Sequence, residues 1–182
     1  MITSEVFACP GVQLVADGRN LPFASGDLRG IVMTDVLHHI PDVAAFFREA
    51  TRCLRPGGVV VMVEPWVSPW SRLIYTHLHH EPFEPEVDRW DFPAKGPLSD
   101  ANGALPWILF ERDRSRFEEE FSHLSIQEIR PMMPFRYLVS GGVSMRALMP
   151  GYTTSVWKMI ERICEPQMKR LAMFALISLR RV

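Results

Sequence analysis

Three short apolar runs and one amphipathic segment organise the first third of the chain. Gln13–Asp17 and Ile31–Met33 have the composition of strands. Val59–Val63 is apolar at every position, which is typical of a central parallel strand covered on both faces. Between the second and third runs, Asp42 is a candidate N-cap of a helix. The apolar residues after it recur at helical spacing on one face: Val43, Phe46, Phe47, Ala50 and Leu54. The order strand, helix, strand predicts a right-handed crossover and an α/β sheet.

Beyond Pro65 the pattern becomes less regular. The stretch from Trp66 to Phe110 holds four of the five tryptophans, and we interpret it as an insertion that covers one end of the sheet. Further elements are predicted along the rest of the chain: helices at Ser71–His79, Arg112–Phe121 and Val156–Cys164, and strands at Ser125–Ile129 and Met173–Leu179. The length of 182 residues suggests that these elements belong to one domain.

Charge and cysteine content narrow the class of protein. With 20 Lys+Arg against 21 Asp+Glu, the net charge of −1 disfavours nucleic acid as a partner. The three cysteines form no Cys-x-x-Cys pair, so neither a disulfide framework nor a zinc ribbon is indicated, and a reducing, cytoplasmic compartment fits best. We expect no membrane span, because no apolar run approaches about 20 residues.

Four motifs stand in order between residues 17 and 65. They are Asp17-Gly18-Arg19-Asn20-Leu21-Pro22-Phe23, Val36-Leu37-His38-His39-Ile40-Pro41-Asp42, the run from Arg48 to Gly58, and Glu64-Pro65. In this order and spacing, the segment from Glu5 to Pro65 resembles the class I, Rossmann-like methyltransferases that use S-adenosylmethionine. The resemblance implies an α/β fold, with helices on both faces of a Rossmann-like sheet, and S-adenosylmethionine as the cofactor.

The resemblance also implies where the cofactor binds. Glu5 corresponds to the acid that holds the ribose hydroxyls, and Asp17 to the acid that accepts from the adenine amino group, with the Gly18 backbone beside it. Thr34-Asp35-Val36 would lie against the methionine part. Acidic residues are expected at these positions for two reasons. Open α/β sheets bind ligands at the carboxyl ends of their strands, and one carboxylate can accept hydrogen bonds from two vicinal hydroxyls.

The glycine-rich loop of this family has no counterpart before Glu5. We therefore expect an N-terminally truncated fold without the first strand and its glycine loop, in which the strand at Gln13–Asp17 has no neighbour. Either the sequence is a fragment, for example from a start site assigned too late, or the product has lost cofactor binding. We expect this chain alone to be inactive. Its single domain would comprise a partial cofactor-binding half (1–65), the insertion (66–110) and the C-terminal part of the sheet with a helical insertion (111–182).

Two histidines of the second motif are candidate catalytic residues. His38 and His39 would stand at the mouth of the substrate pocket, where an imidazole can take a proton from the nucleophile as the methyl group arrives. The alternative is structural, with one of them holding the strand-to-helix turn and packing against the cofactor. A dedicated base is optional, because the sulfonium is already activated and alignment can supply most of the rate.

The run His77-Leu78-His79-His80-Glu81 is a second candidate for chemistry. Histidines with a carboxylate can ligate zinc or iron. However, no Asp completes the pattern of metallo-β-lactamase-like hydrolases and no strand immediately precedes it, so we expect no metal here. We favour His79, His80 and Glu81 as substrate-pocket residues or as ordinary packing of the insertion.

The leading hypothesis is a methyltransferase that acts on a small-molecule or lipid- or sugar-linked acceptor. The alternative is a non-catalytic, methyltransferase-like fragment that binds a protein partner through an exposed sheet edge, and such an edge could also support a homo-oligomer. A nicotinamide-dependent oxidoreductase on a similar sheet is disfavoured, because the Leu-His-His and Arg-Pro-Gly-Gly motifs belong to the methyltransferase pattern.

Overall fold

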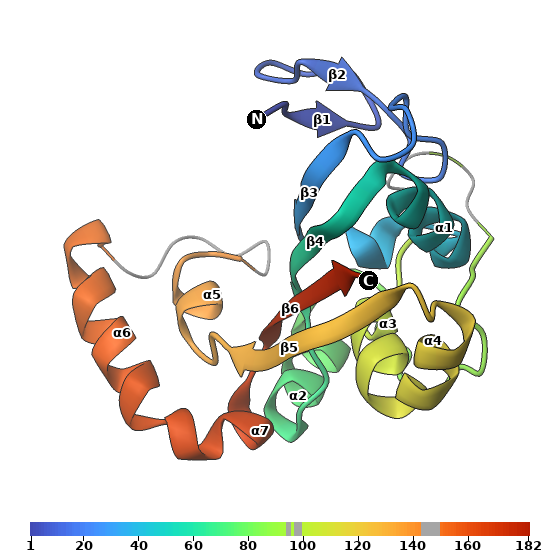
Figure 1. The fold of residues 1–182 in the computed structure, drawn as a ribbon. Helices are drawn as coiled ribbons and strands as arrows, with labels where there is room; N and C mark the ends of the chain where they lie inside the picture. The colour runs from blue at the N-terminus through green and yellow to red at the C-terminus, as the bar shows by residue number, and fades with distance from the viewer. Residues whose placement is uncertain (94–95, 97–99, 143–149) are drawn as a thin grey trace.

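Four strands form the central sheet, in the order β3-β4-β6-β5 (Figure 1). β3 (Leu28–Thr34) and β4 (Leu54–Pro65) are parallel, and β6 (Phe174–Arg181) lies antiparallel between β4 and β5 (Leu124–Met132). The computed structural model describes residues 1–93, 96, 100–142 and 150–182. The parallel pair confirms the predicted crossover, and β3 forms one edge of this sheet.

Two very short strands make a separate, two-stranded sheet. β1 (Ser4–Glu5) pairs in parallel with β2 (Leu14–Val15), in a register that sets Glu5 opposite Val15. The prediction that the strand at Gln13–Asp17 would have no neighbour is therefore wrong, because the two residues of β1 supply its hydrogen-bonding partner.

Helix α1 (Val43–Cys53) connects β3 to β4 and packs on the sheet. It begins at the predicted N-cap, Asp42, whose Oδ1 accepts from the backbone nitrogen of Ala45 at 2.8 Å. The helix is one residue shorter than its apolar repeat, because Leu54 already belongs to β4. Leu54 is nevertheless fully buried, so the last position of the repeat serves the core from a strand.

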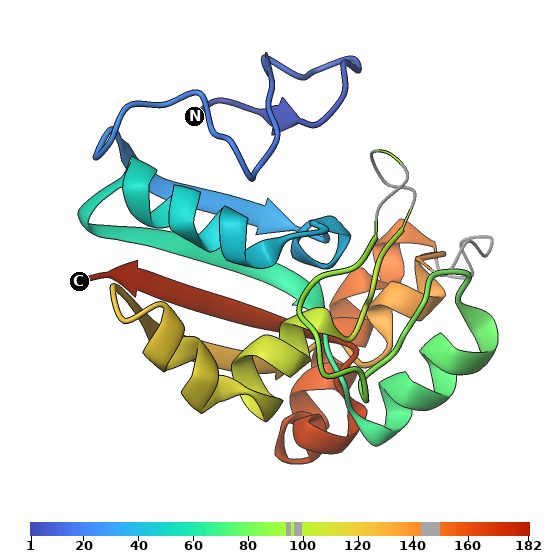
Figure 2. The ribbon, with the colours of Figure 1, turned by 90° about the vertical axis from the view of Figure 1, so that its right-hand side faces the viewer.

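The main core lies between the sheet and a layer of helices. This layer consists of α1, α3 (Leu105–Trp107), the π-helical η2 (Ile108–Arg112) and α4 (Arg114–Glu120), which Figure 2 shows over one face of the sheet. Phe47 of α1 is fully buried and meets Phe110 and Phe117 edge to face, with ring centroids 6.0 and 5.1 Å apart. These aromatic contacts join the first half of the chain to the second.

Among the residues that the structure describes, those on the second face of the sheet cover it at one end only. There α2 (Pro69–Leu78) and α5 (Arg136–Val139) contribute to a smaller cluster around Tyr75 and Phe174. Away from this end the Val32 and Val59 side chains, which point to this face, are 74% and 37% exposed. Helices thus lie on both sides of the sheet, as Figure 1 shows, but with unequal cover.

The remaining elements are η1 (Leu37–His39), η3 (Gly151–Thr153), α6 (Thr154–Ile163), η4 (Glu165–Gln167) and α7 (Met168–Leu171). All the helices and strands predicted beyond Pro65 are present, with shifted ends. Part of the predicted insertion, residues 94–95 and 97–99, lies outside the described residues, and the three-part division stays a prediction. Among the described helices, none is long and apolar enough to cross a membrane.

Candidate functional site

The candidate site forms where the carboxyl ends of β3 and β4 meet the loop after α2. Because β3 and β4 are parallel, residues 35–39 after β3 and Glu64 in β4 reach the same edge of the sheet, namely the one formed by the carboxyl ends of these strands. The loop after α2 brings Glu81 to this edge. The site is therefore built from three segments that are distant in sequence.

Glu64 organises the turn that carries the histidines. Its Oε1 accepts from the backbone nitrogens of Val36 and Leu37, both at 2.9 Å, and its Oε2 lies 2.8 Å from Nδ1 of His38. The side chains of Glu64 and His38 are 0% and 1% exposed. A buried carboxylate with three donors is fully satisfied, so it fixes both the backbone turn and the orientation of the His38 ring.

Glu81 stands at the centre of the predicted polar residues. Its Oε2 lies 3.6 Å from Nε2 of His38, and its Oε1 lies 3.7 Å from Nε2 of His39. Nδ1 of His79 and Nε2 of His80 lie 3.9 and 3.7 Å from the same carboxylate. The structure thus joins the two predicted catalytic histidines to the three predicted substrate-pocket residues in one cluster.

The two best-connected groups of the cluster have strongly shifted pKa values. Burial disfavours the charged form of His38, but the carboxylates of Glu64, Glu81 and Asp35 outweigh it and raise the pKa of His38 to about 9. Interaction with His38 lowers the pKa of the Glu81 carboxyl to about 2. At neutral pH the cluster therefore holds a cationic His38 beside an anionic Glu81.

Their neighbours shift in the opposite directions. Partial burial raises the pKa of Asp35, and the nearby carboxylates of Glu64 and Glu81 add to this effect against the opposing influence of His38. Burial, followed by the charge of His38, lowers the pKa of His39. Asp35 also adopts a backbone φ of 60°, a value that a non-glycine residue rarely takes and that is often associated with functional sites.

The residues predicted to hold the adenosine part lie apart from this cluster. Asp17 follows β2, and its carboxylate is bound by the Arg19 guanidinium, with Nη2 to Oδ2 at 2.7 Å. This contact lowers the pKa of Asp17. Gly18 packs closely on α1, where a Cβ would come within 3.3 Å of Phe46. Glu5 is exposed on β1, next to the strand that leads to Asp17.

Two further residues of the predicted methionine site occupy the end of β3. Thr34 is its last residue and is exposed, and Val36 is 37% exposed while its backbone nitrogen is held by Glu64. Together with Asp35, they connect the strand to the histidine turn. The predicted methionine site and the histidine cluster therefore share one edge of the sheet.

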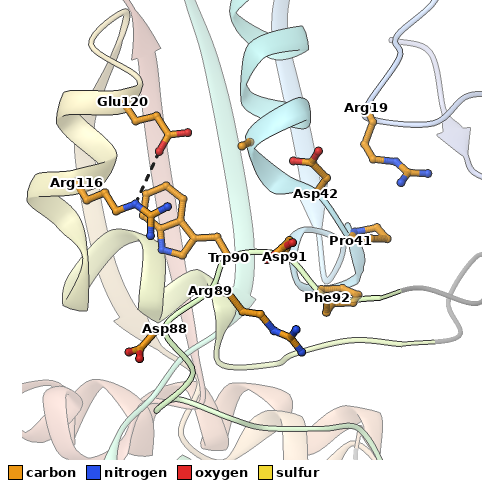
Figure 3. Close-up of a pocket in the computed structure, with 11 residues that line it drawn as sticks. Arg19, Pro41, Asp42, Asp88, Arg89, Trp90, Asp91, Phe92, Arg116 and Glu120 are labelled. Carbon is orange, nitrogen blue, oxygen red and sulfur yellow. Dashed lines mark ion pairs between the residues drawn. The ribbon is translucent and has the colours of Figure 1, made fainter.

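A cavity of about 580 Å³ lies beside the start of α1 (Figure 3). Arg19 and Asp42 are on one side of it, and Trp90 and Arg116 on the other, with the guanidinium carbon of Arg116 3.9 Å from the centroid of the Trp90 ring. None of the predicted site residues lines this cavity. Its walls carry both signs of charge, and one of them is formed by Arg19, the partner of Asp17.

Two residues that support the cluster are absent from the sequence prediction. The backbone nitrogen of Asn102 donates to the carbonyl of His38 at 3.0 Å, and the Tyr137 hydroxyl lies 3.4 Å from Nε2 of His79. Neither residue stands in a motif. The role of Glu64 could have been predicted from the sequence. A carboxylate directly after a buried apolar run needs hydrogen-bond donors close by.

A comparison with known protein families gives a match in the N-terminal third of the chain. A family model described as a methyltransferase domain matches residues 4–62. Residues 4–62 are therefore similar to a methyltransferase domain. The matched segment contains β1 to β3, α1 and most of β4, so it includes Asp17, Asp35 and both histidines of the turn. The resemblance inferred from the four motifs is confirmed for this methyltransferase segment.

Curated relatives match over a similar length. Two uncharacterized methyltransferases, from Mycobacterium sp. strains JLS and KMS, are each 33% identical to this chain over 73 residues. The alignment covers 37% of this chain and 29% of each relative. The chain therefore spans less than a third of the length of the relatives that it matches.

Solved structures of methyltransferases match this chain at low sequence identity. Geranyl diphosphate C-methyltransferase from Streptomyces coelicolor A3(2) is 16% identical, with a TM-score of 0.49 and coverage of 93% of this chain and 54% of that chain. An S-adenosylmethionine-dependent methyltransferase from Methanosarcina mazei is 14% identical, with a TM-score of 0.48 and coverage of 96% and 73%.

Proposed function

We propose that this chain is part of an S-adenosylmethionine-dependent methyltransferase that acts on a small-molecule or lipid- or sugar-linked acceptor. The observation that carries the proposal is the methyltransferase segment, residues 4–62, which forms the strand-helix-strand unit beside the polar edge of the sheet. The acceptor class is supported by a nearly neutral net charge of −1, which offers little attraction to a polyanion.

The adenosine part of the cofactor would bind near the ends of β1 and β2. Glu5 and Asp17 extend from two adjacent parallel strands, so their carboxylates can address one ligand, with Glu5 at the ribose and Asp17 at the adenine amino group. The Asp17 side chain is 40% exposed. Binding then requires Asp17 to share or exchange its Arg19 contact, while Gly18 keeps the chain close to α1.

The methionine part would extend along Thr34-Asp35-Val36 toward the histidine cluster. Because the methyl group of a sulfonium is already activated, the main task of the protein is to align the acceptor nucleophile with it and to exclude water. His38, His39 and Glu81, with His79 and His80 beside them, lie where the acceptor would enter. In this arrangement Glu64 fixes the orientation of the His38 ring.

Calorimetric titration of S-adenosylhomocysteine into the purified chain tests cofactor binding. We expect saturable binding by the wild type and a 5- to 150-fold weaker affinity for Asp17→Ala, corresponding to about 1–3 kcal/mol for the hydrogen bond lost in the complex. Asp88→Ala is the matched control, because this exposed residue lines the cavity of Figure 3 and not the predicted cofactor site. Absence of binding by the wild type contradicts the proposal, and a loss seen only in Asp88→Ala moves the ligand to that cavity.

The acceptor class needs a separate experiment. A version extended upstream in the same reading frame is used, because we expect this chain alone to be inactive. It is incubated with methyl-labelled S-adenosylmethionine and a cell extract, which is then divided into water-soluble small molecules, lipids, protein and nucleic acid. We expect transferred label in the small-molecule or lipid fraction. Label confined to protein or nucleic acid contradicts this part of the proposal, even if the cofactor binds as expected.

A further inference from the structure

Three potential metal-binding side chains converge at the candidate site. One ligand atom from each of His38, His39 and Glu81 lies within 4.8 Å of the others. The two oxygens of Glu81 face different imidazoles, at 3.6 Å from Nε2 of His38 and 3.7 Å from Nε2 of His39. These separations are too long for hydrogen bonds. They are close to the roughly 3.3 Å that separates ligand atoms in a tetrahedral site with bonds of about 2.0–2.1 Å.

The orientation of His38 leaves its second nitrogen available to a cation. Nδ1 points to the acceptor oxygen of Glu64 at 2.8 Å, and it therefore carries a hydrogen. Nε2 then faces Oε2 of Glu81 and, at 3.9 Å, Oδ1 of Asp35. A metal ion bound at Nε2 would take the place of the proton that the cationic imidazole carries there, and it would face the same two carboxylates. A buried carboxylate behind a histidine is also the usual support of a metal ligand.

The surroundings of the cluster favour a cation for a second reason. The half-buried ring of His39 interacts with the carboxylate of Glu81 and with the backbone of Asp100. Three carboxylates, those of Asp35, Glu64 and Glu81, surround the two imidazoles. A divalent ion would offset the negative charge of these three carboxylates, and leaving buried charge without a partner is costly.

We propose that Nε2 of His38, Nε2 of His39 and the carboxylate of Glu81 bind a divalent transition-metal ion of the Zn²⁺ class. Two histidines and one carboxylate form a donor set that first-row metals prefer, and three protein ligands leave a position for an oxygen ligand. Glu64 is then a positioning residue that orients His38. The sequence run from His77 to Glu81 contributes only its last residue as a ligand.

The ion would have a defined chemical use at this edge of the sheet. A hydroxyl bound at the open position of a divalent metal loses its proton more easily and becomes a better nucleophile. In a methyl transfer, this oxygen would belong to the acceptor. That use depends on the proposed function, but binding of the ion does not, and metal titration without any S-adenosylmethionine compound tests it separately.

The test is calorimetric titration of Zn²⁺ into the chelator-treated chain, combined with visible absorption of the Co²⁺ form. We expect one ion per chain and at least about 100-fold weaker binding in Glu81→Gln and in His39→Ala, with a changed Co²⁺ spectrum in each. Glu81→Gln preserves size at a side chain that is 27% exposed, so it keeps the test valid if His39→Ala fails to fold. Glu64→Gln should weaken binding by about 10- to 100-fold without removing a ligand.

His77→Ala is the matched control, because His77 is exposed on α2 and stands outside the cluster. Unchanged Zn²⁺ affinity in this variant supports the proposal. Absence of Zn²⁺ and Co²⁺ binding by the wild type overturns it, as does binding that survives in both Glu81→Gln and His39→Ala. Loss of binding in His77→Ala or His80→Ala, with Glu81→Gln unaffected, would place the ion at surface histidines and would also overturn it.

Discussion

The backbone nitrogen of Asn102 donates a hydrogen bond to the carbonyl oxygen of His38 at 3.0 Å. The Asn102 side chain in turn accepts from the backbone nitrogens of Glu84 and Ala104, both at 3.0 Å, and donates to the Glu84 carbonyl at 3.1 Å. A single buried amide therefore connects the loop after α2 to the histidine turn. The position of Glu81 depends on this connection, although Glu81 itself is far from Asn102 in sequence.

Asn102→Ala should destabilise the fold and loosen the Glu81 loop together. We expect a loss of about 1–3 kcal/mol in the free energy of unfolding, because buried backbone groups of Glu84 and Ala104 lose their partners. Urea denaturation measures this loss, and Zn²⁺ affinity should fall in parallel. Glu84→Gln is the control, since it keeps the backbone contacts. An Asn102→Ala protein of wild-type stability would show that the amide is dispensable.

The Glu64 and His38 pair should be strongly coupled in a double-mutant cycle. Glu64→Gln alone is expected to cost about 3–5 kcal/mol, because it leaves buried groups of the histidine turn without their charged partner. In the double variant Glu64→Gln, His38→Asn, the loss should be smaller than the sum of the single losses by about 1–3 kcal/mol. Chemical denaturation of the four proteins provides the numbers. Additivity within about 0.5 kcal/mol would contradict a direct interaction.

The Arg112 and Asp113 pair predicts a pH-dependent term in stability. Hydrogen bonds from Arg112, and then from Nε1 of Trp90, lower the pKa of Asp113 from its usual value of 3.8. A carboxyl group with a lowered pKa stabilises the fold above its unfolded pKa, and this contribution disappears as pH falls through the folded pKa. Asp113→Asn should therefore cost about 1 kcal/mol near pH 7 and progressively less below about pH 4.

Unfolding of wild type and Asp113→Asn across this pH range checks the sign. The control is Glu119→Gln, an exposed change on α4 that should alter the free energy of unfolding by less than about 0.5 kcal/mol. A penalty for Asp113→Asn that grows on acidification would disprove the proposed origin of the stabilisation.

Asp42→Ala should weaken α1 at its first turn. The lost bond to the backbone nitrogen of Ala45 is expected to cost about 1 kcal/mol, which corresponds to a melting temperature lower by about 2–4 °C in a protein of this size. Asp42→Ser retains a capping oxygen and should recover most of the loss in thermal denaturation followed by circular dichroism. Equal melting temperatures for both variants would indicate that capping is not the cause.

The sequence predicted the fold best where local patterns determine the structure. The helical repeat after Asp42 and the apolar run at Val59–Val63 correspond to α1 and to β4. The order of strands could not be obtained in this way, because the place of β6 between β4 and β5 depends on pairing over long distances in sequence. The sequence also did not indicate that one face of the sheet is less covered than the other. Val32 and Val59 are exposed there, but valine is equally common in buried strands.

The candidate site was predicted in pieces and assembled by the fold. Motifs supplied His38 and His39, and a separate run of polar residues supplied Glu81, but no spacing rule relates positions that are some forty residues apart. The contact arises because α2 reverses the chain after β4 and Asn102 fixes the loop. The run from His77 to Glu81 was expected to hold no metal, and its spacing alone did not indicate that Glu81 lies beside His38 and His39.

The position of β6 also affects how this chain folds during synthesis. Leu124 of β5 pairs with Arg181, and Val59 of β4 pairs with Arg180, whereas β4 and β5 do not pair with each other. On the ribosome, the β3-α1-β4 unit emerges early, but it cannot be joined to β5 until residues 174–181 have left the exit tunnel. Phe47, Phe110 and Phe117 all precede β6, so the aromatic core can form first, while one edge of β4 has no hydrogen-bonding partner until β6 is made. During that interval the open edge can pair with other chains, which makes the partly synthesised protein prone to aggregation.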